Sequence, residues 1–312
     1  MIEPKPGGVV TEAYLRVKPE DGYELRDVMG GDLRREVRVL DHGFVALVDA
    51  MPRMVAVEPG SGEAPSADGA IVQAARVSYG VGTKKVSEDR GLIRYLMRHR
   101  HTTPFEMVEF KFHCSMPIFI ARQWIRHRTA NVNEYSGRYS IMPDRFYHPT
   151  VDAVRKQSKT NRQGGEESID AATAQQFLDY LTRAEEHYKE YVSLTEQGVT
   201  RELARAGLPV NLYTEWYWKC DLHNILHFLN LRLDEHAQLE IREYARAMLA
   251  LIEPIVPVAV EAFRDYMLEG MRLTRLEIDA IRNGNPEIET TNSREQREWQ
   301  DKRGRLGISD DR

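Results

Sequence analysis

Apolar positions recur with two different periods along the chain, and the two periods predict different elements. Residues 37–51 and 109–115 alternate between apolar and polar positions, which predicts strands. Helices are predicted from about Ile71 and over residues 87–100, where Ser87 is a candidate N-cap. In the second half, a long amphipathic helix is predicted from apolar residues at steps of four and three, ended by Gly198: Phe177, Leu181, Ala184, Tyr188 and Tyr191.

This order of elements predicts a mixed α+β fold whose second half is rich in helix. We expect one catalytic domain over residues 37–282, with a polar insertion at about 155–168. Residues 1–36, rich in Gly, Pro and charged residues, read as an N-terminal extension. Residues 283–312 offer little to bury and read as a polar C-terminal tail, either disordered or a loosely attached helix.

Composition and charge exclude some classes of protein. The formal net charge is -5, from 43 basic and 48 acidic residues, so the chain lacks the basic field of a general nucleic-acid binder. The first ten residues have no apolar core and do not resemble a signal peptide. The most apolar later stretch is interrupted by Glu253, Pro254 and Pro257, so no membrane span is predicted. We expect a cytoplasmic protein with no nucleic-acid or membrane partner.

Residues 126–138 carry the densest group of ligand-binding side chains: Arg126, His127, Arg128, Glu134, Ser136 and Arg138. Crowded guanidinium groups repel one another and are costly to desolvate, unless an anion lies between them. A solvated surface is the alternative, because most arginine clusters on proteins face water. The local context favours a pocket for a phosphate-bearing molecule.

The segments on either side support that interpretation. Residues 117–125 read as the opening of a helix, with Pro117 near its first turn. On that helix Gln123, Arg126 and His127 share one face, and the last two lie near its C-terminal end. Residues 131–137 favour turns, which predicts a polar loop whose backbone amides are free to bind a ligand.

Neither cysteine is a convincing nucleophile. Cys114 falls on the apolar side of the predicted strand at 109–115, and a buried thiol is inert. Cys220 precedes Asp221, whose charge raises the pKa of a neighbouring thiol. A disulfide is not expected in a cytoplasmic protein.

His223 and His227 stand four residues apart and offer a rival hypothesis, a zinc site completed by Asp234 or His236. The residues between them are Asn-Ile-Leu, so the glutamate of a zinc hydrolase motif is absent. Ordinary helix histidines are a further alternative. No metal is assigned.

The pattern Arg-His-Arg, seven residues, then Ser at 126–136 resembles the signature of the flavin-dependent thymidylate synthases. The resemblance extends over roughly residues 40–270 through further segments in the same order: AARVSY at 74–79, HTTPFE at 101–106, IFIARQWIRHR at 118–128, LPVNLYTEWYW at 208–218 and LHFLNLRLDEHAQLEIREYA at 226–245.

The resemblance implies reductive methylation of dUMP to dTMP without a cysteine nucleophile. It also implies FAD as redox cofactor, with NADPH and 5,10-methylenetetrahydrofolate as co-substrates. A homotetramer with active sites shared between subunits is expected. A helical projection is consistent with sharing: the five steps from His227 to Arg232 turn about 140°, so a straight helix cannot point both into one pocket.

The resemblance also implies roles for single residues. Arg232 is the leading catalytic residue, since its charge would stabilise negative charge on the pyrimidine. The remaining dUMP contacts are Gln123, Arg126, Glu134, Tyr135, Ser136, Gly137, Arg138 and Arg205. The FAD contacts are Ser78, Thr103, Arg126, His127, Arg128, Thr129, Glu134, Asp221, His223 and His227. His101 and Tyr139 are expected to form walls of the folate and flavin stack.

Two positions depart from the family pattern. Some relatives have Asn at the position of Asp221, and a carboxylate would repel FAD phosphates, so Asp221 is expected to cap a helix or to meet ribose hydroxyls. Met107 stands where some members have a second histidine. The alternative function is a non-catalytic nucleotide- or RNA-binding module built on the same arginines, which leaves Gln123 and Glu134 without a role.

Overall fold

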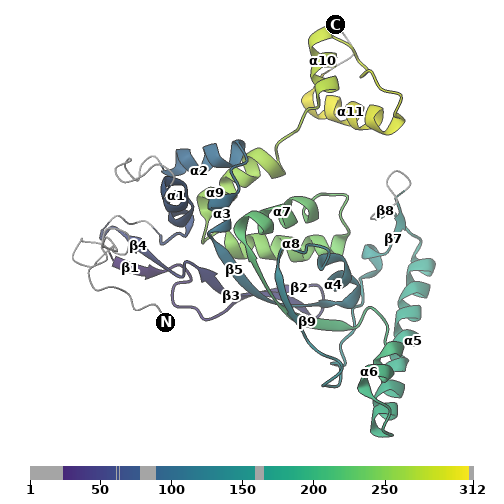
Figure 1. Cartoon of the computed structure of the whole chain (residues 1–312). Coiled ribbons are helices and arrows are strands. Elements are labelled where there is room, and N and C mark those ends of the chain that lie inside the picture. The colour runs from purple at the N-terminus through teal and green to yellow at the C-terminus, as the bar shows by residue number, and fades with distance from the viewer. Residues whose placement is uncertain (1–23, 61, 63, 78–88, 159–164, 309–312) are drawn as a thin grey trace, which may run out of the picture. The chain divides into compact units, whose positions relative to one another are not determined.

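The computed structural model describes residues 24–308 apart from 61, 63, 78–88 and 159–164 (Figure 1). The chain divides into two compact units, Met1–Glu261 and Ala262–Arg312. The first unit contains strands and helices together, so the α+β prediction is confirmed. No helix in the described ranges is long and apolar enough to cross a membrane.

A five-stranded antiparallel sheet forms the centre of the first unit, in the order β2-β3-β5-β9-β6. Its strands are β2 (Arg35–Val39), β3 (Gly43–Met51), β5 (Glu109–Pro117), β6 (Asn131–Glu134) and β9 (Tyr213–Asp221). The alternation in β5 buries Phe110, Phe112 and Cys114 on one face, as the sequence predicted. Two smaller sheets pair β1 (Glu24–Asp27) with β4 (Met54–Val57), and β7 (Arg155–Gln157) with β8 (Gly165–Ser168).

The helices of the first unit pack around this sheet. Figure 1 shows α7 (Leu222–Arg232) and α8 (Leu239–Ile252) over one face of the sheet, close to α4 (Ile118–Trp124). A second group contains α1 (Asp68–Val77), α2 (Asp89–Arg98) and α3 (Thr103–Glu106). The long helix α5 (Ala171–Glu196) lies beside α6 (Arg201–Ala204), and α9 (Pro257–Phe263) spans the boundary between the units.

Several predicted elements differ in detail. The single strand expected over residues 37–51 is a hairpin, because the chain turns at Leu40, which has φ 59°, before β3 begins. The polar insertion at 155–168 contributes β7 and β8. The long helix is confirmed as α5, with Asp170 as its N-cap and Gly198 (φ 95°) just beyond its end. Ser87 lies outside the described residues, and α2 begins at Asp89.

The second unit contains α10 (Arg275–Asn283) and α11 (Ser293–Leu306), which share a small core. Trp299 is fully buried there, together with Ala280 and Ile288. Trp299 and Ile288 thus give residues 283–308 a small core, although the sequence predicted little to bury after residue 282. The end of the catalytic domain stays a prediction.

Candidate nucleotide and flavin site

The helix that leads into the Arg-His-Arg segment is shorter than expected. Pro117 precedes the first residue of α4, and the helix ends at Trp124. Arg126 and His127 follow in a turn, in which the His127 N–H donates to the Trp124 carbonyl at 3.0 Å. They are therefore placed by the turn and not by a helical face, although Gln123 and Arg126 still line one cleft.

The chain then enters a strand where a loop with free amides was expected. Asn131–Glu134 forms β6, which pairs with β9 at the edge of the sheet, and Val132 lies opposite Trp218. This pairing provides hydrogen-bond partners for main-chain groups that β9 would otherwise expose. The added hydrogen bonds outweigh the preference of Asn131 and Asn133 for turns. The expected turn begins later, where the Tyr139 and Ser140 amides donate to the Ser136 carbonyl at 3.1 and 3.2 Å.

A cleft of about 700 Å³ lies between α4 and the turn that joins α7 to α8. It is lined by Gln123, Arg126, Asn230, Leu231, Arg232, Asp234, His236, Ala237 and Gln238. Three of these residues, Gln123, Arg126 and Arg232, carry dUMP assignments from the sequence. The others belong to the matched segment 226–245, but no local pattern predicts the bend after Arg232 that turns them into the cleft.

Arg232 is held by a histidine from the signature segment. Its Nε donates to Nε2 of His127 at 3.1 Å, and the His127 ring also lies edge-on to His227 with centroids 6.1 Å apart. Burial, followed by the charges of Arg232 and His227, lowers the pKa of His127 to about 4. His127 is therefore neutral near pH 7 and accepts a hydrogen bond, so it adds no positive charge to the cluster.

The Arg232 guanidinium is itself half-buried. Burial lowers the pKa of Arg232, but an arginine stays protonated in proteins. Within the described chain its only hydrogen bond is the one from Nε, so both terminal nitrogens can bind a ligand. Arg232 lines the cleft and His227 is not among the lining residues, in keeping with their different directions on α7.

A second group of predicted nucleotide contacts lies outside this cleft. It comprises Ser136, Gly137, Arg138 and Arg205, none of which lines the cleft. A Cβ atom at Gly137 would lie 2.8 Å from Met142 Sδ and 3.3 Å from Arg205 Cδ, so a larger residue would require these two side chains to shift where the turn meets Arg205. The guanidinium of Arg138 stacks over the exposed Tyr139 ring at 5.1 Å.

The remaining assigned residues are spread over several elements. The Glu134 Oε1 accepts from the Thr214 hydroxyl at 2.9 Å, and the Tyr135 hydroxyl donates to the Ile141 carbonyl at 2.8 Å. Thr103 begins α3, His101 lies just before it, and His223 is half-buried on α7. Thr129 and Arg128 follow His127 in the exposed turn. Ser78 lies outside the described residues.

Asp221 is the N-cap of α7, and its carboxylate accepts from the Asn224 N–H at 2.9 Å. The expectation that Asp221 caps a helix is confirmed. This hydrogen bond gives the Asp221 carboxylate a structural role that requires no contact with a cofactor phosphate.

Four cations of the candidate site have no acidic partner among the described residues: Arg126, Arg128, Arg138 and Arg205. Beside Arg126, the buried Gln123 Oε1 accepts no hydrogen bond. A buried acceptor without a donor costs about 1–3 kcal/mol, which a ligand N–H would relieve. These arginines together with the Gln123 oxygen therefore fit an anion that also carries an N–H group. Arginine side chains of this kind also suit the pyrophosphate of a flavin.

Both cysteines are buried, which the sequence predicted for Cys114 but not for Cys220. Burial raises the pKa of Cys114 far above its usual value, and burial with the Asp221 charge raises the pKa of Cys220 to about 12. Neither thiol forms a thiolate readily near pH 7. Among the residues with described positions, no group of three or more His, Cys, Asp or Glu side chains is placed to hold a metal.

Solved structures share the fold of this chain. The crystal structure of the UMP/dUMP methylase PolB from Streptomyces cacaoi bound with 5-Br UMP is 33% identical, with a TM-score of 0.63. The alignment covers 74% of this chain and 98% of the other. The complex of the same methylase with 5-Br dUMP gives 34% identity and a TM-score of 0.61, over 73% and 97% of the two chains. The chain has the fold of these nucleotide methylases.

Sequence relatives give the family. Residues 62–258 match the family model described as thymidylate synthase complementing protein. The flavin-dependent thymidylate synthase of Dictyostelium discoideum is 65% identical over 288 residues, or 92% of each chain. The enzyme of the same name from Thermus thermophilus is 55% identical over 247 residues, or 79% of this chain and 84% of the other. The chain belongs to the flavin-dependent thymidylate synthase family.

The state of His127 yields a pH prediction. Because the pKa of His127 is lowered from 6.5 to about 4, its neutral form stabilises the fold fully above pH 6.5, and this contribution is lost as the pH falls toward 4. We expect the His127 ring carbon resonance, followed by NMR, to titrate with a midpoint near 4. A midpoint near 6.5 would contradict the burial of this ring against Arg232.

The variant Arg232→Met tests how much the charge of Arg232 contributes to the lowered pKa of His127. Removal of the charge should raise the His127 midpoint but not restore it to 6.5, because burial is the larger cause. Arg246→Met is the matched control, since Arg246 is exposed on α8 and pairs with Glu243, and it should leave the midpoint unchanged.

Proposed function

We propose that this protein methylates dUMP to dTMP, using 5,10-methylenetetrahydrofolate as carbon donor, NADPH as reductant and FAD as cofactor. In the balanced reaction, dUMP, methylenetetrahydrofolate, NADPH and a proton give dTMP, tetrahydrofolate and NADP⁺. The family membership supports the reaction, and the structural relatives whose names refer to UMP and dUMP support the substrate class. We expect the protein to act in the cytoplasm.

The main support for the proposal is the combination of cationic side chains and an unsatisfied hydrogen-bond acceptor in the cleft. Arg126 and Arg232 supply positive charge beside Gln123, whose Oε1 is buried and lacks a donor. A uracil ring carries one N–H flanked by two carbonyls, and it can donate to this oxygen while its carbonyls accept from neighbouring cations. A nucleotide thus satisfies together the charge and the hydrogen-bond acceptor that the protein leaves unpaired.

Arg232 has the properties that the catalytic step requires. Carbon transfer needs C5 of the pyrimidine to become nucleophilic, which places negative charge on the ring oxygens. A half-buried guanidinium with free terminal nitrogens stabilises that charge more strongly than a solvated one. The neutral His127 fixes the direction of the guanidinium without competing as a second cation.

The side chains around the turn at 126–129 would hold the flavin. The exposed guanidinium of Arg128 suits its phosphates, and His227 and Thr129 can donate hydrogen bonds. Bound flavin supplies the electron pair that the reduction of the transferred carbon requires. The chain's own task is to bind, orient and neutralise charge.

The separation of the two predicted nucleotide groups supports a shared site. Arg126 and Arg232 line the cleft, whereas Gly137 and Arg205 meet elsewhere on the same chain. We propose that the 136–138 turn and Arg205 complete the cleft of a neighbouring subunit in a homotetramer. Each subunit would then contribute residues to more than one active site.

The proposed function is tested with the purified protein and FAD. The protein should bind FAD, bleach on anaerobic addition of NADPH, and form dTMP only when dUMP and methylenetetrahydrofolate are both present. A protein that does not take up FAD, or that forms no dTMP when loaded with it, would refute the proposal.

Sharing of the site is tested by mixing two inactive variants, Arg232→Ala and Arg205→Ala. If the two arginines of one site come from different subunits, a random equal mixture re-assembled from separated subunits leaves about one quarter of the sites with both arginines. Activity should return to about that fraction of wild type. A mixture as inactive as its components would place both arginines in the site of one chain.

A further inference from the structure

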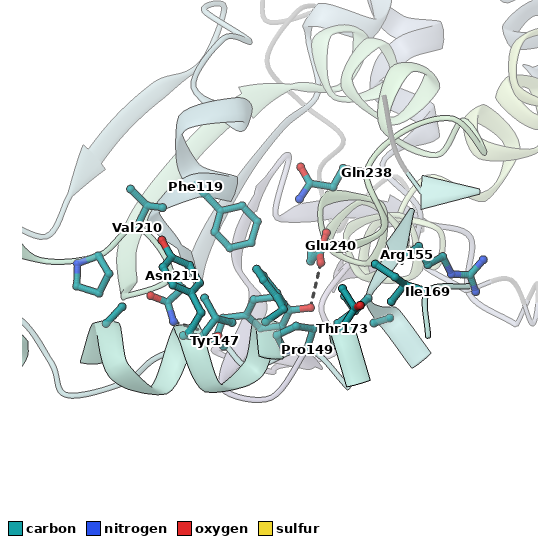
Figure 2. Close-up of a pocket in the computed structure, with 17 residues that line it drawn as sticks. Phe119, Tyr147, Pro149, Arg155, Ile169, Thr173, Val210, Asn211, Gln238 and Glu240 are labelled. Atoms are coloured by element: carbon teal, nitrogen blue, oxygen red, sulfur yellow. Dashed lines mark hydrogen bonds between the residues drawn. The ribbon is translucent and has the colours of Figure 1, made fainter. Parts of the chain in front are cut away.

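A second cavity lies next to the nucleotide cleft, and none of the residues assigned to dUMP or FAD lines it. Its volume is about 680 Å³, and it lies between α5, the segments at 147–155 and 209–211, and the start of α8. Gln238 lines both this cavity and the cleft, so the two adjoin at this residue. Figure 2 shows aromatic and aliphatic side chains around most of the cavity, among them Phe119 and Tyr147.

Two side chains that line the cavity, Asn211 and Glu240, offer hydrogen-bond acceptors, and Arg155, Thr173 and Gln238 also line it. Asn211 is 5% exposed, and its amide nitrogen donates to the Tyr147 carbonyl at 3.2 Å. The Asn211 Oδ1 is buried and accepts no hydrogen bond. Such an acceptor stays costly until a donor reaches it.

Glu240 supplies a second acceptor, and it is charged. It lies in the first turn of α8, where the helix dipole favours an ionised carboxylate. The Tyr147 hydroxyl donates to Oε1 at 3.0 Å, as the dashed line in Figure 2 marks. No cation among the described residues forms an ion pair with Glu240. The carboxylate therefore lines the cavity without an ion-pair partner among the described residues, although Arg155 lines the same cavity.

The cavity and the cleft thus differ in their charged groups. The cleft is lined by Arg126, Arg232 and Asp234, whereas the cavity is lined by Glu240 and Arg155, beside the Asn211 amide oxygen that accepts no hydrogen bond from a described residue. A nucleotide phosphate would be repelled by Glu240. Aromatic walls favour a flat ring, and the acceptors favour N–H donors on its edge.

We propose that this cavity is a second ligand site, which binds a flat heteroaromatic ring bearing amino groups, in its protonated form. One amino group donates to the Glu240 carboxylate and a second donor reaches the Asn211 Oδ1. The ring lies against Phe119 and Tyr147. The site depends on neither the flavin nor the nucleotide.

The test is isothermal titration of the full-length protein with 2,4-diaminopyrimidine, compared with unsubstituted pyrimidine. Both compounds have the same ring, but the second lacks the amino donors. The diamino compound should bind and pyrimidine should not. Glu240→Gln keeps an acceptor for Tyr147 but removes the charge, and should weaken binding on the order of tenfold.

A steric pair of variants locates the site. Ala184 lines the cavity from α5, so Ala184→Trp should fill it and abolish binding. The neighbouring Arg183 is exposed and does not line the cavity, so Arg183→Trp should bind as wild type does. Circular dichroism shows whether both variants are folded. If Ala184→Trp is unfolded, the binding to Glu240→Gln and the comparison with unsubstituted pyrimidine test the proposal instead.

Three results would overturn the proposal. These are no binding of 2,4-diaminopyrimidine to the wild-type protein, equal binding of unsubstituted pyrimidine, and unchanged binding in both a folded Ala184→Trp variant and Glu240→Gln. A change in oligomeric state caused by Ala184→Trp, in a protein that binds no diaminopyrimidine, would assign the cavity to contact with a second copy of the chain.

Discussion

The packing of one indole ring determines where the residues of the cleft lie. Trp124 is fully buried at the end of α4, and its ring centroid lies 4.9 Å from that of Phe228 on α7 and 5.5 Å from that of Trp216 on β9. The aromatic contacts join α4, the central sheet and α7 into one rigid group. Because Gln123 and Arg126 flank Trp124, the same contacts bring them beside Arg232.

This rigidity gives the histidine of the signature segment its role. The His127 ring lies edge-on to Phe228 at 4.9 Å, so the ring is desolvated and stays neutral. A neutral acceptor can direct the Arg232 guanidinium while leaving its full charge for a ligand. The guanidinium groups of Arg126 and Arg232 thus lie in the cleft, while the adjoining cavity, which shares Gln238 with it, contains the Glu240 carboxylate, which forms no ion pair with a described residue.

The sequence predicted the α+β class, β5, α5 and the group of cleft residues Gln123, Arg126 and Arg232. It did so where the signal is local, in alternation, helical period or a motif of fixed spacing, whereas Arg232 was assigned from the family resemblance. It did not predict β6, because Asn-Val-Asn-Glu becomes a strand only through pairing with β9. The neutral state of His127 also depends on neighbours distant in the sequence. That Ser136, Gly137, Arg138 and Arg205 do not line the cleft of their own chain likewise follows from tertiary packing, which no local pattern indicates.

The central claim is that the charge of Arg232, and no thiolate, makes C5 of dUMP reactive. The most direct measurement is release of tritium from dUMP labelled at C5 by the reduced, FAD-loaded protein. The account predicts release by the double variant Cys114→Ala, Cys220→Ala close to the wild-type rate, and release at least about a hundredfold slower by Arg232→Ala. Loss of release in a folded double cysteine variant, with release retained in Arg232→Ala, would contradict it.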